Sequence, residues 1–222
     1  MTFTRSILDQ ELAGLQASIL RLTSMVKTAV NEAMRSLYER NIVLAQQVMT
    51  NDEEINRLRY AIEQNALLVL ATQQPAAGDL RSIIAAIHIA VKLERMGDHA
   101  AGIARLVNRM AEDDDIDSFH KLPKMEKRVC LMIDEMIDAY TDRSVEKAEK
   151  MMRRDDKVDK HYKTLFQETL SEMEETDYIR RATFLLWVGH NLERIGDRLI
   201  NVAERVIFMV SGEFVENSLD FD

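Results

Sequence analysis

The stretch HIAVKLERMGDHAAGIARLVNRM (residues 88–110) recurs in altered form as WVGHNLERIGDRLINVAERVIFM (residues 187–209). Eight of the 23 aligned positions are identical, and several of the others exchange one apolar residue for another. Each copy sets two acidic residues four positions apart, with a glycine just before the second. Inside a helix a glycine costs about 1 kcal/mol relative to alanine, and like charges at this spacing cost a few tenths more. A locally unfavourable fragment that occurs twice predicts an internal duplication with a shared purpose.

The repetition extends upstream of these two stretches. VMTNDEEIN (residues 48–56) resembles MMRRDDKVD (residues 151–159). Between the blocks the first copy has the loop-like QQPAAGD, where the second has the shorter EETD. Each copy is interpreted as three helices joined by short loops, which places neighbouring helices antiparallel.

Capping signals suggest where these helices begin. In the first copy we expect a helix from about residue 6 to residue 47. Thr50 and Glu53 form a candidate capping box for the second helix, and Asp79 is a good N-cap for the third. In the second copy the helices are expected at about 120–150, 155–174 and 177–210.

The composition favours helices throughout. Only two prolines occur in 222 residues, and the strong helix formers are abundant. Alternation of apolar and polar residues at period two, which would indicate strands, is absent. The predicted fold is all-α, with two tandem antiparallel three-helix bundles produced by internal duplication. The expected units are a first repeat at 1–112, a second repeat at 118–213 and a tail at 214–222.

Charge and hydropathy exclude several classes of protein. The net charge is -9 and the pI about 5.2, and no basic patch stands out in the sequence, so nucleic acid is not an expected partner. The longest strongly apolar stretch, IIAAIHIAV, is too short for a spanning helix, which needs about 20 residues. No signal peptide is recognisable at the N-terminus, and a single cysteine, Cys130, excludes an internal disulfide framework. A cytoplasmic protein is predicted.

Two stripes follow the last helix of each repeat. One is apolar with recurring small residues and includes Gly97 and Gly196, which predicts a face that another helix approaches closely. The neighbouring stripe begins apolar and turns acidic at the same point in both copies. The acidic pairs are Glu94 with Asp98, and Glu193 with Asp197.

The middle helix of each repeat adds further oxygen donors. Because it runs antiparallel to the last helix, Asp155 and Asp159 are expected to face Asp197 and Asn201. In the first copy the corresponding residues are poorer donors. Asp52 is retained, but Asn56 stands where the second copy has Asp159, and Gly102 where it has Asn201.

Carboxylates gathered at one place are unfavourable unless protons or cations neutralise them. Oxygen-rich sites suit cations such as Mg, Ca, Mn and iron. Two structural alternatives remain, namely a solvated charged edge and acids favoured by the helix dipole. Recurrence in both copies favours a metal site. The predicted ligands are Glu94, Asp98, Glu193, Asp197, Asp155, Asp159, Asn201 and Asp52, with Asn56 as a weaker candidate.

A duplicated three-helix repeat that carries LER-(M/I)-GD in each last helix resembles the PhoU family of phosphate-transport regulators. The family signature, Glu/Asp-x-x-x-Asp, matches Glu94–Asp98 and Glu193–Asp197, and Asp155–Asp159 fits as a further copy. Asp52–Asn56 departs from it at the second position. The resemblance covers nearly the whole chain.

The resemblance implies a cytoplasmic, non-enzymatic negative regulator that binds multinuclear metal clusters. Iron is the expected metal, with Zn, Mn, Mg or Ca as possible occupants. The implied partners are a phosphate-specific ABC transporter and the sensor histidine kinase of a two-component system. Association with the membrane would then be peripheral and through these partners, and a homodimer is expected.

Two other functions stay open on the residues alone. A metallo-hydrolase acting on a phosphate compound could use the same carboxylates, although no general acid or phosphate clamp is recognisable. Arg81 and Arg180, at equivalent positions of the two repeats, are the basic candidates for such a clamp. The third possibility is an interaction module in which the acids only solubilise a helix edge.

Overall fold

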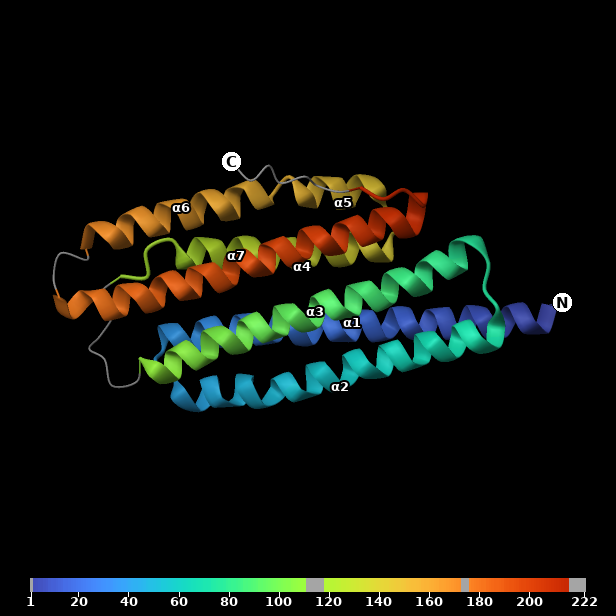
Figure 1. Cartoon of the computed structure of the whole chain (residues 1–222), viewed down its shortest axis with the longest axis horizontal. Helices are drawn as coiled ribbons and strands as arrows, with labels where there is room; N and C mark the ends of the chain where they lie inside the picture. Colours follow the sequence, from blue (N-terminus) through green and yellow to red (C-terminus); the bar gives the residue numbers. More distant parts are fainter. Residues whose placement is uncertain (1, 111–117, 173–175, 216–222) are drawn as a thin grey trace.

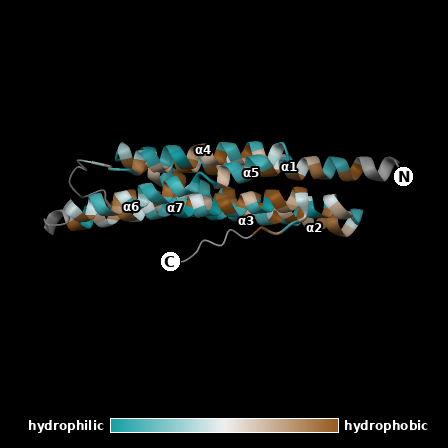
Figure 2. Cartoon of the chain, turned by 90° about the horizontal axis from the view of Figure 1, so that it is seen from above, coloured by the Kyte–Doolittle hydropathy of each residue, from teal (hydrophilic) through white to brown (hydrophobic). Residues whose placement is uncertain are grey.

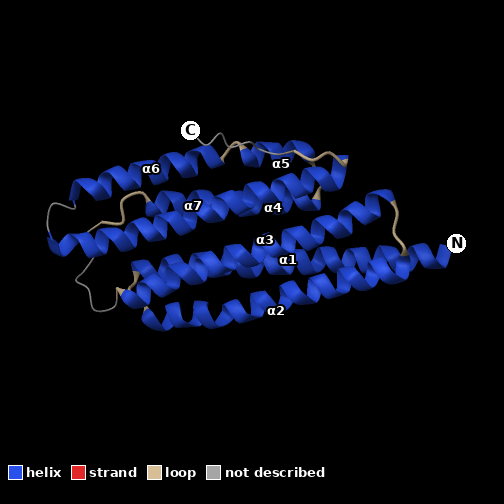
Figure 3. Cartoon of the chain, in the orientation of Figure 1, coloured by secondary structure: helices blue, strands red, loops and turns tan. Residues whose placement is uncertain are grey.

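The computed structural model describes residues 2–110, 118–172 and 176–215, with side chains for 7–110, 118–171 and 179–215. This part of the chain is helical apart from short connections (Figure 3). The predicted all-α fold of two tandem three-helix bundles is confirmed. The first bundle contains α1 (Thr2–Tyr38), α2 (Ile42–Gln73) and α3 (Ala77–Arg109), and the second contains α4 (Leu122–Thr141), α5 (Val145–Met152), α6 (Asp155–Glu172) and α7 (Thr176–Ser211).

The two bundles lie side by side and share one layer. α6, α7, α3 and α2 follow one another across this layer, and α4 and α1 pack behind it (Figures 1 and 2). α3 and α7 run antiparallel at the centre, where they form the most extensive contact between any two helices, while α1 and α4 also touch. None of the described helices combines the length and the apolar character that crossing a membrane would require.

The apolar stripes predicted from the sequence form the core. In α3 and in α7 the stripe residues are buried, including both glycines. Burial of apolar surface at about 25 cal/mol per Å² is the main force that holds the helices together. The buried members are Ile83, Ala86, Ala90, Leu93, Gly97 and Ala104 in α3, and Ala182, Leu185, Gly189, Leu192, Gly196 and Ala203 in α7.

The expected helix from 6 to 47 is wrong, because the chain turns sharply before α2. Arg40 adopts a left-handed conformation with φ 51°, and α2 then begins after Asn41. The Asn41 side chain accepts a hydrogen bond from the backbone N–H of Leu44 at 2.9 Å, which caps the helix. The proposed capping box is therefore also wrong, since Thr50 lies inside α2 and donates to the carbonyl of Gln46.

The second repeat breaks at the equivalent place. Arg143 is left-handed at φ 50°, and Ser144 caps α5 by accepting from the N–H of Lys147 at 3.2 Å. The expected helix from 120 to 150 is thus two helices. A further interruption at Arg153 and Arg154 separates α5 from α6, so the counterpart of the continuous α2 is divided.

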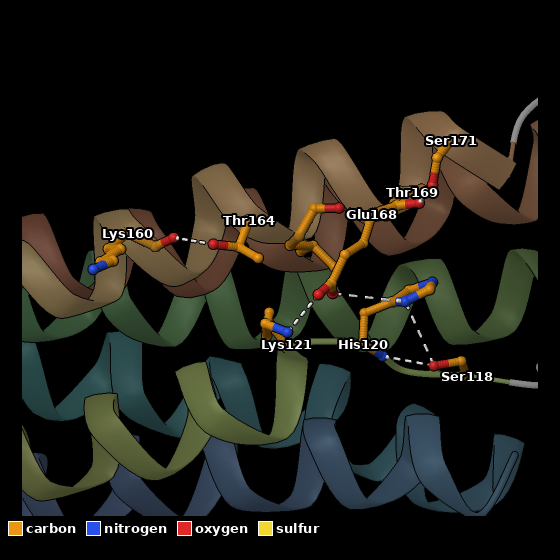
Figure 4. A network of polar contacts seen from close by, with 9 residues as sticks. Ser118, His120, Lys121, Lys160, Thr164, Glu168, Thr169 and Ser171 are labelled. Atoms are coloured by element: carbon orange, nitrogen blue, oxygen red, sulfur yellow. Dashed lines mark hydrogen bonds and ion pairs between the residues drawn. The ribbon is translucent and has the colours of Figure 1, made fainter.

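The expected N-cap of the third helix is also wrong. α3 begins after Ala76, which offers no side-chain cap, and Asp79 lies within the first turn of the helix. An acid in that turn still interacts favourably with the helix dipole. Polar contacts tie α6 to the start of α4: Lys121 and Glu168 form an ion pair, and His120 lies 3.8 Å from the same carboxylate (Figure 4).

Candidate metal centre

Glycine allows a carboxylate of the middle helix to lie against the last helix in each repeat. A Cβ atom built on Gly196 would stand 2.7 Å from Oδ1 of Asp155. A Cβ atom on Gly97 would stand 3.2 Å from Oδ1 of Asp52. The close approach expected of these glycines is therefore present in both copies. At Gly196 the carboxylate is the nearest group, whereas at Gly97 the side chain of Ile55 shares the space with Asp52, at 3.1 Å from the Cβ position.

Four carboxylates, those of Asp155, Asp159, Glu193 and Asp197, lie along the line where α6 meets α7 and repel one another; this line, and the equivalent one between α2 and α3, is called a furrow below. Burial first, and then the charges of Asp159, Asp197 and Glu193, raise the pKa of Asp155 to about 7. Burial and the charges of Asp197 and Asp159 raise the pKa of Glu193 to about 7. The pKa of Asp159 is raised as well, by burial and by Asp197. The sequence prediction that these acids face one another is reproduced by the structure.

The furrow between α2 and α3 is a weaker version of the same arrangement. Burial and the charges of Asp98 and Glu94 raise the pKa of Asp52 to about 6, while Arg105 opposes the shift. The pKa of Glu94 is raised by burial and by Asp98. Asp155 is only 6% exposed, whereas Asp52 is half-buried and Asp98 is exposed. The first furrow is thus the more open of the two.

Each furrow contains buried carboxylate oxygens that have no hydrogen-bond donor among the described residues. Within the described part of the chain, Oδ1 of Asp52, Oδ1 of Asp155 and Oε2 of Glu193 are buried and accept no hydrogen bond. A buried polar atom in that condition costs about 1–3 kcal/mol. A proton or a cation would supply the missing interaction, and hard cations prefer such oxygen donors.

The remaining predicted ligands contribute less to either furrow. Asn56 donates to the backbone oxygen of Asp52 at 3.2 Å, so its amide points toward its own helix. Asn201 is half-buried in α7 and makes no hydrogen bond to the described carboxylates. Among the described residues no group of three or more His, Cys, Asp or Glu side chains already stands in an arrangement that could hold a metal ion. Coordination would therefore require side-chain rotations.

Three residues outside the predicted set of metal ligands lie at the furrows. Arg59 bonds Glu63 at 2.7 Å and lies 3.8 Å from Glu94, and Arg194 bonds Asp197 at 2.9 Å. Nδ1 of His190 lies 3.6 Å from Oε2 of Glu193, beyond ordinary hydrogen-bond distance. The spacing of His190 and Glu193, three residues apart on a helix, was the available signal. Arg59 gave no such signal because it reaches Glu94 from another helix.

The chain is a duplicated three-helix unit. In each copy the last helix presents a glycine and two acids to a carboxylate of the middle helix. This arrangement defines the class of the protein, which is that of tandem-repeat helical proteins built from PhoU domains. The PhoU domain matches the chain twice, over residues 19–107 and 122–206. The chain belongs to the PhoU family.

Relatives and solved structures cover nearly the whole chain. A protein of Clostridium acetobutylicum named phosphate-specific transport system accessory protein PhoU homolog is 35% identical over 96% of this chain and 98% of its own. The crystal structure of the phosphate transport system regulatory protein PhoU from Streptococcus pneumoniae superimposes with a TM-score of 0.88, at 30% identity, over 94% of this chain and 99% of that one. PhoU from Pseudomonas aeruginosa gives 0.87 at 33% identity, over 92% and 99%.

Proposed function

We propose that the protein is a regulatory accessory protein of a phosphate-specific transport system. The observation that carries this proposal is full-length similarity to proteins with that name, in sequence and in fold. We further propose that it acts in the cytoplasm as a negative regulator of phosphate uptake and of phosphate-starvation two-component signalling. It would do so without catalysis, as a homodimer that reaches the membrane through the transporter and a sensor histidine kinase.

Metal binding at the two furrows is part of the proposal. Asp155, Asp159, Glu193 and Asp197 would hold the ions in the second repeat, and Asp52, Glu94 and Asp98 in the first. One carboxylate oxygen each of Asp52, Asp155 and Glu193 is buried and accepts no hydrogen bond. These oxygens support the assignment, because a positively charged or protic partner would stabilise them. Iron is the favoured occupant, and Zn, Mn, Mg and Ca are the alternatives. When bound, the ions would supply positive charge that offsets the repulsion between the carboxylates.

The structure suggests how these residues would affect docking. Glu193 and Asp197 lie on α7, and Asp155 begins α6, so ligands from both helices would be drawn together. Bound ions would thereby cross-link α6 to α7, close to the interruption between α5 and α6. Neutralisation of the acidic furrows would change the electrostatic surface that a partner meets.

The test compares the chain with a Glu193→Ala, Asp197→Ala double variant. We expect the purified double variant to contain less metal, as measured by elemental analysis, and to bind the transporter and the kinase more weakly in pull-down and titration experiments. Glu11→Ala with Asp138→Ala removes two exposed acids, one from α1 and one from α4, and serves as the control. Unchanged metal content in the furrow variant would refute the metal assignment, and unchanged binding to both partners would refute the proposed role.

The hydrolase alternative has no additional support from the furrows. A cavity of about 270 Å³ is lined by residues that include Asp9, Asp79, Ser82, Tyr140 and Arg143, and none of the paired acids lines it. Arg180, one of the two basic residues considered for a phosphate clamp, donates to the backbone oxygen of Arg109 at 3.2 Å. Phosphatase assays with added Mn or Fe distinguish this alternative from the regulatory proposal.

A further inference from the structure

The cavity of about 270 Å³ lies where the two bundles meet, and it is separate from both furrows because none of the paired acids lines it. Its walls come from α1 and α3 of the first bundle, and from α4, the turn after α4 and α7 of the second. Nη2 of Arg143, in that turn, donates a hydrogen bond to Oγ of Ser82 on α3 at 2.7 Å. A ligand in this cavity would therefore contact both halves of the chain.

The part of α1 that lines the cavity has no counterpart in α4. The PhoU domain matches the chain from residue 19 and again from residue 122, and these positions are equivalent in the repeat. α4 begins at Leu122, whereas α1 begins at Thr2 and so extends further toward the N-terminus. The lining residues of α1 all fall in this extension: Asp9, Leu12, Ala13, Leu15 and Gln16. The cavity is therefore a feature of this arrangement of the two bundles and is not produced by the repeated unit alone.

Tyr140 places a buried hydroxyl group at the cavity. Its side chain lines the cavity, is only 5% exposed and makes no hydrogen bond to any described residue. Leu37 stands at the equivalent position of the first repeat and is 2% exposed. Burial raises the pKa of Tyr140 to about 12, and the charge of Arg143 opposes this rise, so the phenol is protonated near neutral pH. Buried polar groups are usually hydrogen-bonded, and this hydroxyl is available as a donor to a ligand.

Arg143 and Gln16 supply the other available donors. Nη2 of Arg143 is used by Ser82, but the guanidinium has no ion-pair partner in the described part of the chain, so its remaining N–H groups can donate. The side-chain amide of Gln16 also lines the cavity without a hydrogen bond to a described residue. Asp9 and Asp79 line the cavity too, but each has a partner of its own. The groups left for a ligand are thus mainly donors, and one of them is positively charged.

The rest of the wall is largely apolar. Its apolar side chains are Leu12, Ala13, Leu15, Ala86 and Met209. An anion that is charged over its whole surface, such as inorganic phosphate, would lose hydration against these side chains without compensation. A carboxylate group is better suited, because its two oxygens can accept from a guanidinium and from a phenol at once. A short hydrocarbon chain attached to it would be buried against the apolar side chains.

We propose that this cavity binds a small organic monocarboxylate with a short hydrocarbon chain. Arg143 and Tyr140 hold the carboxylate, Gln16 donates to it from α1, and the hydrocarbon chain packs against the apolar wall. The site requires no metal ion and goes beyond the proposed regulatory role. Because the ligand contacts α1 and α3 as well as the turn after α4, its binding favours the arrangement in which the two bundles are joined by Arg143 and Ser82.

The test measures binding of butyrate to the full chain by ligand-observed NMR titration, with butyramide, butylammonium and inorganic phosphate titrated in parallel. The site variants are Arg143→Gln and Tyr140→Phe. The matched control is Arg40→Gln, because Arg40 is the equivalent left-handed arginine of the first repeat, with φ 51° against 50°, and does not line the cavity. Circular dichroism and thermal melting establish that each protein is folded. Tyr140→Phe removes only the hydroxyl and decides the question if an arginine variant does not fold.

We expect saturable butyrate binding by the native chain and by the control. Binding should be weaker by at least about tenfold in Arg143→Gln and by at least about threefold in Tyr140→Phe, since a hydrogen bond from a charged donor contributes more than one from a neutral donor. Absence of butyrate binding by the native chain would overturn the proposal, and so would an equal loss in the control. Binding of butyramide, butylammonium or phosphate as tight as that of butyrate would overturn the assignment to a carboxylate.

Discussion

Oδ1 of Asp155 occupies the space beside Gly196 that a side chain would otherwise fill, 2.7 Å from the position of a Cβ atom. Asp52 and Gly97 stand in the same relation at 3.2 Å in the first repeat. The glycine of the repeated fragment is thus tied to the acid on the neighbouring helix as well as to the close packing of the helices. Gly196 is unfavourable for α7 as an isolated helix, but it leaves room for the Asp155 carboxylate of α6.

Replacement of Gly196 by alanine should destabilise the protein. The new methyl group would collide with the Asp155 carboxylate, and overpacking of this kind costs about 1–3 kcal/mol. Gly14 is the matched control, since it lies in α1 with nothing within 4 Å of its Cβ position. Gly14→Ala should stabilise the helix by up to about 1 kcal/mol. Urea unfolding measures the stability of both variants. Equal stabilities would contradict a steric clash between the new methyl group and Asp155.

The metal-free chain should become less stable as the pH rises toward neutrality. The pKa of Asp155 is raised from 3.8 to about 7, so between these values the folded chain binds more protons than the unfolded chain. The free energy of unfolding then falls with increasing pH across that window. Asp155→Asn should therefore stabilise the metal-free chain at pH 8 and have much less effect at pH 4.

Urea unfolding in EDTA at both pH values tests this prediction. Asp138→Asn replaces an exposed acid on α4 and is the control. A stabilisation by Asp155→Asn that is the same at both pH values would show that the effect does not come from the charge of this carboxylate.

The two repeats should differ in metal affinity. Asp155 is buried, and the charges of Asp159, Asp197, Glu193 and Asp156 act on it. Asp52 is half-buried, and its furrow has Asn56 where the second repeat has Asp159. Asp155→Asn should consequently remove more bound metal than Asp52→Asn. Titration with Mn²⁺, followed by elemental analysis, measures the difference. Equal losses would show that the sites are equivalent, and a larger loss with Asp52→Asn would reverse the assignment.

The side-chain caps at the equivalent turns should contribute measurably to stability. Asn41→Ala and Ser144→Ala each remove the acceptor for a helix N-terminal N–H and should cost about 1 kcal/mol. Ser18, whose hydroxyl donates to the carbonyl of Gly14 within α1, provides a control that should change stability little when replaced by alanine. Thermal unfolding compares the three, and a loss at Ser18 as large as at the caps would argue against a specific capping effect.

Much of the fold could be predicted because the same periodic pattern occurs twice. The apolar stripe through Leu93 and Gly97 indicated a buried face, and its repetition indicated two bundles. The turns at Arg40 and Arg143 could not be found in this way. Left-handed residues are usually glycine, and an arginine in that conformation carries no compositional signal. Asn41 and Ser144 were available as caps, but Thr50 and Glu53 matched a better-known pattern.

The candidate site could also be predicted from the sequence only in part. The spacing of Glu193 and Asp197 on one helix was readable, and the antiparallel arrangement placed Asp155 beside them. Contacts between helices depend on rotamers and on tertiary packing, which no local spacing encodes. For that reason the contact of Arg59 with Glu94 was not anticipated.

The antiparallel contact of α3 with α7 has the form of an isologous interface, in which one surface meets its own equivalent across a two-fold axis. Arg95 acts electrostatically on Arg198, and Arg194 acts on His99. These pairs are equivalent, because Arg95 corresponds to Arg194 in the repeat and His99 corresponds to Arg198. The chain is therefore built as a dimer of one ancestral three-helix unit would be, with the two protomers fused into a single polypeptide. Because both halves belong to one polypeptide, their contact forms at any protein concentration, and each half can carry its own side chains, as Asn56 and Asp159 do at equivalent positions.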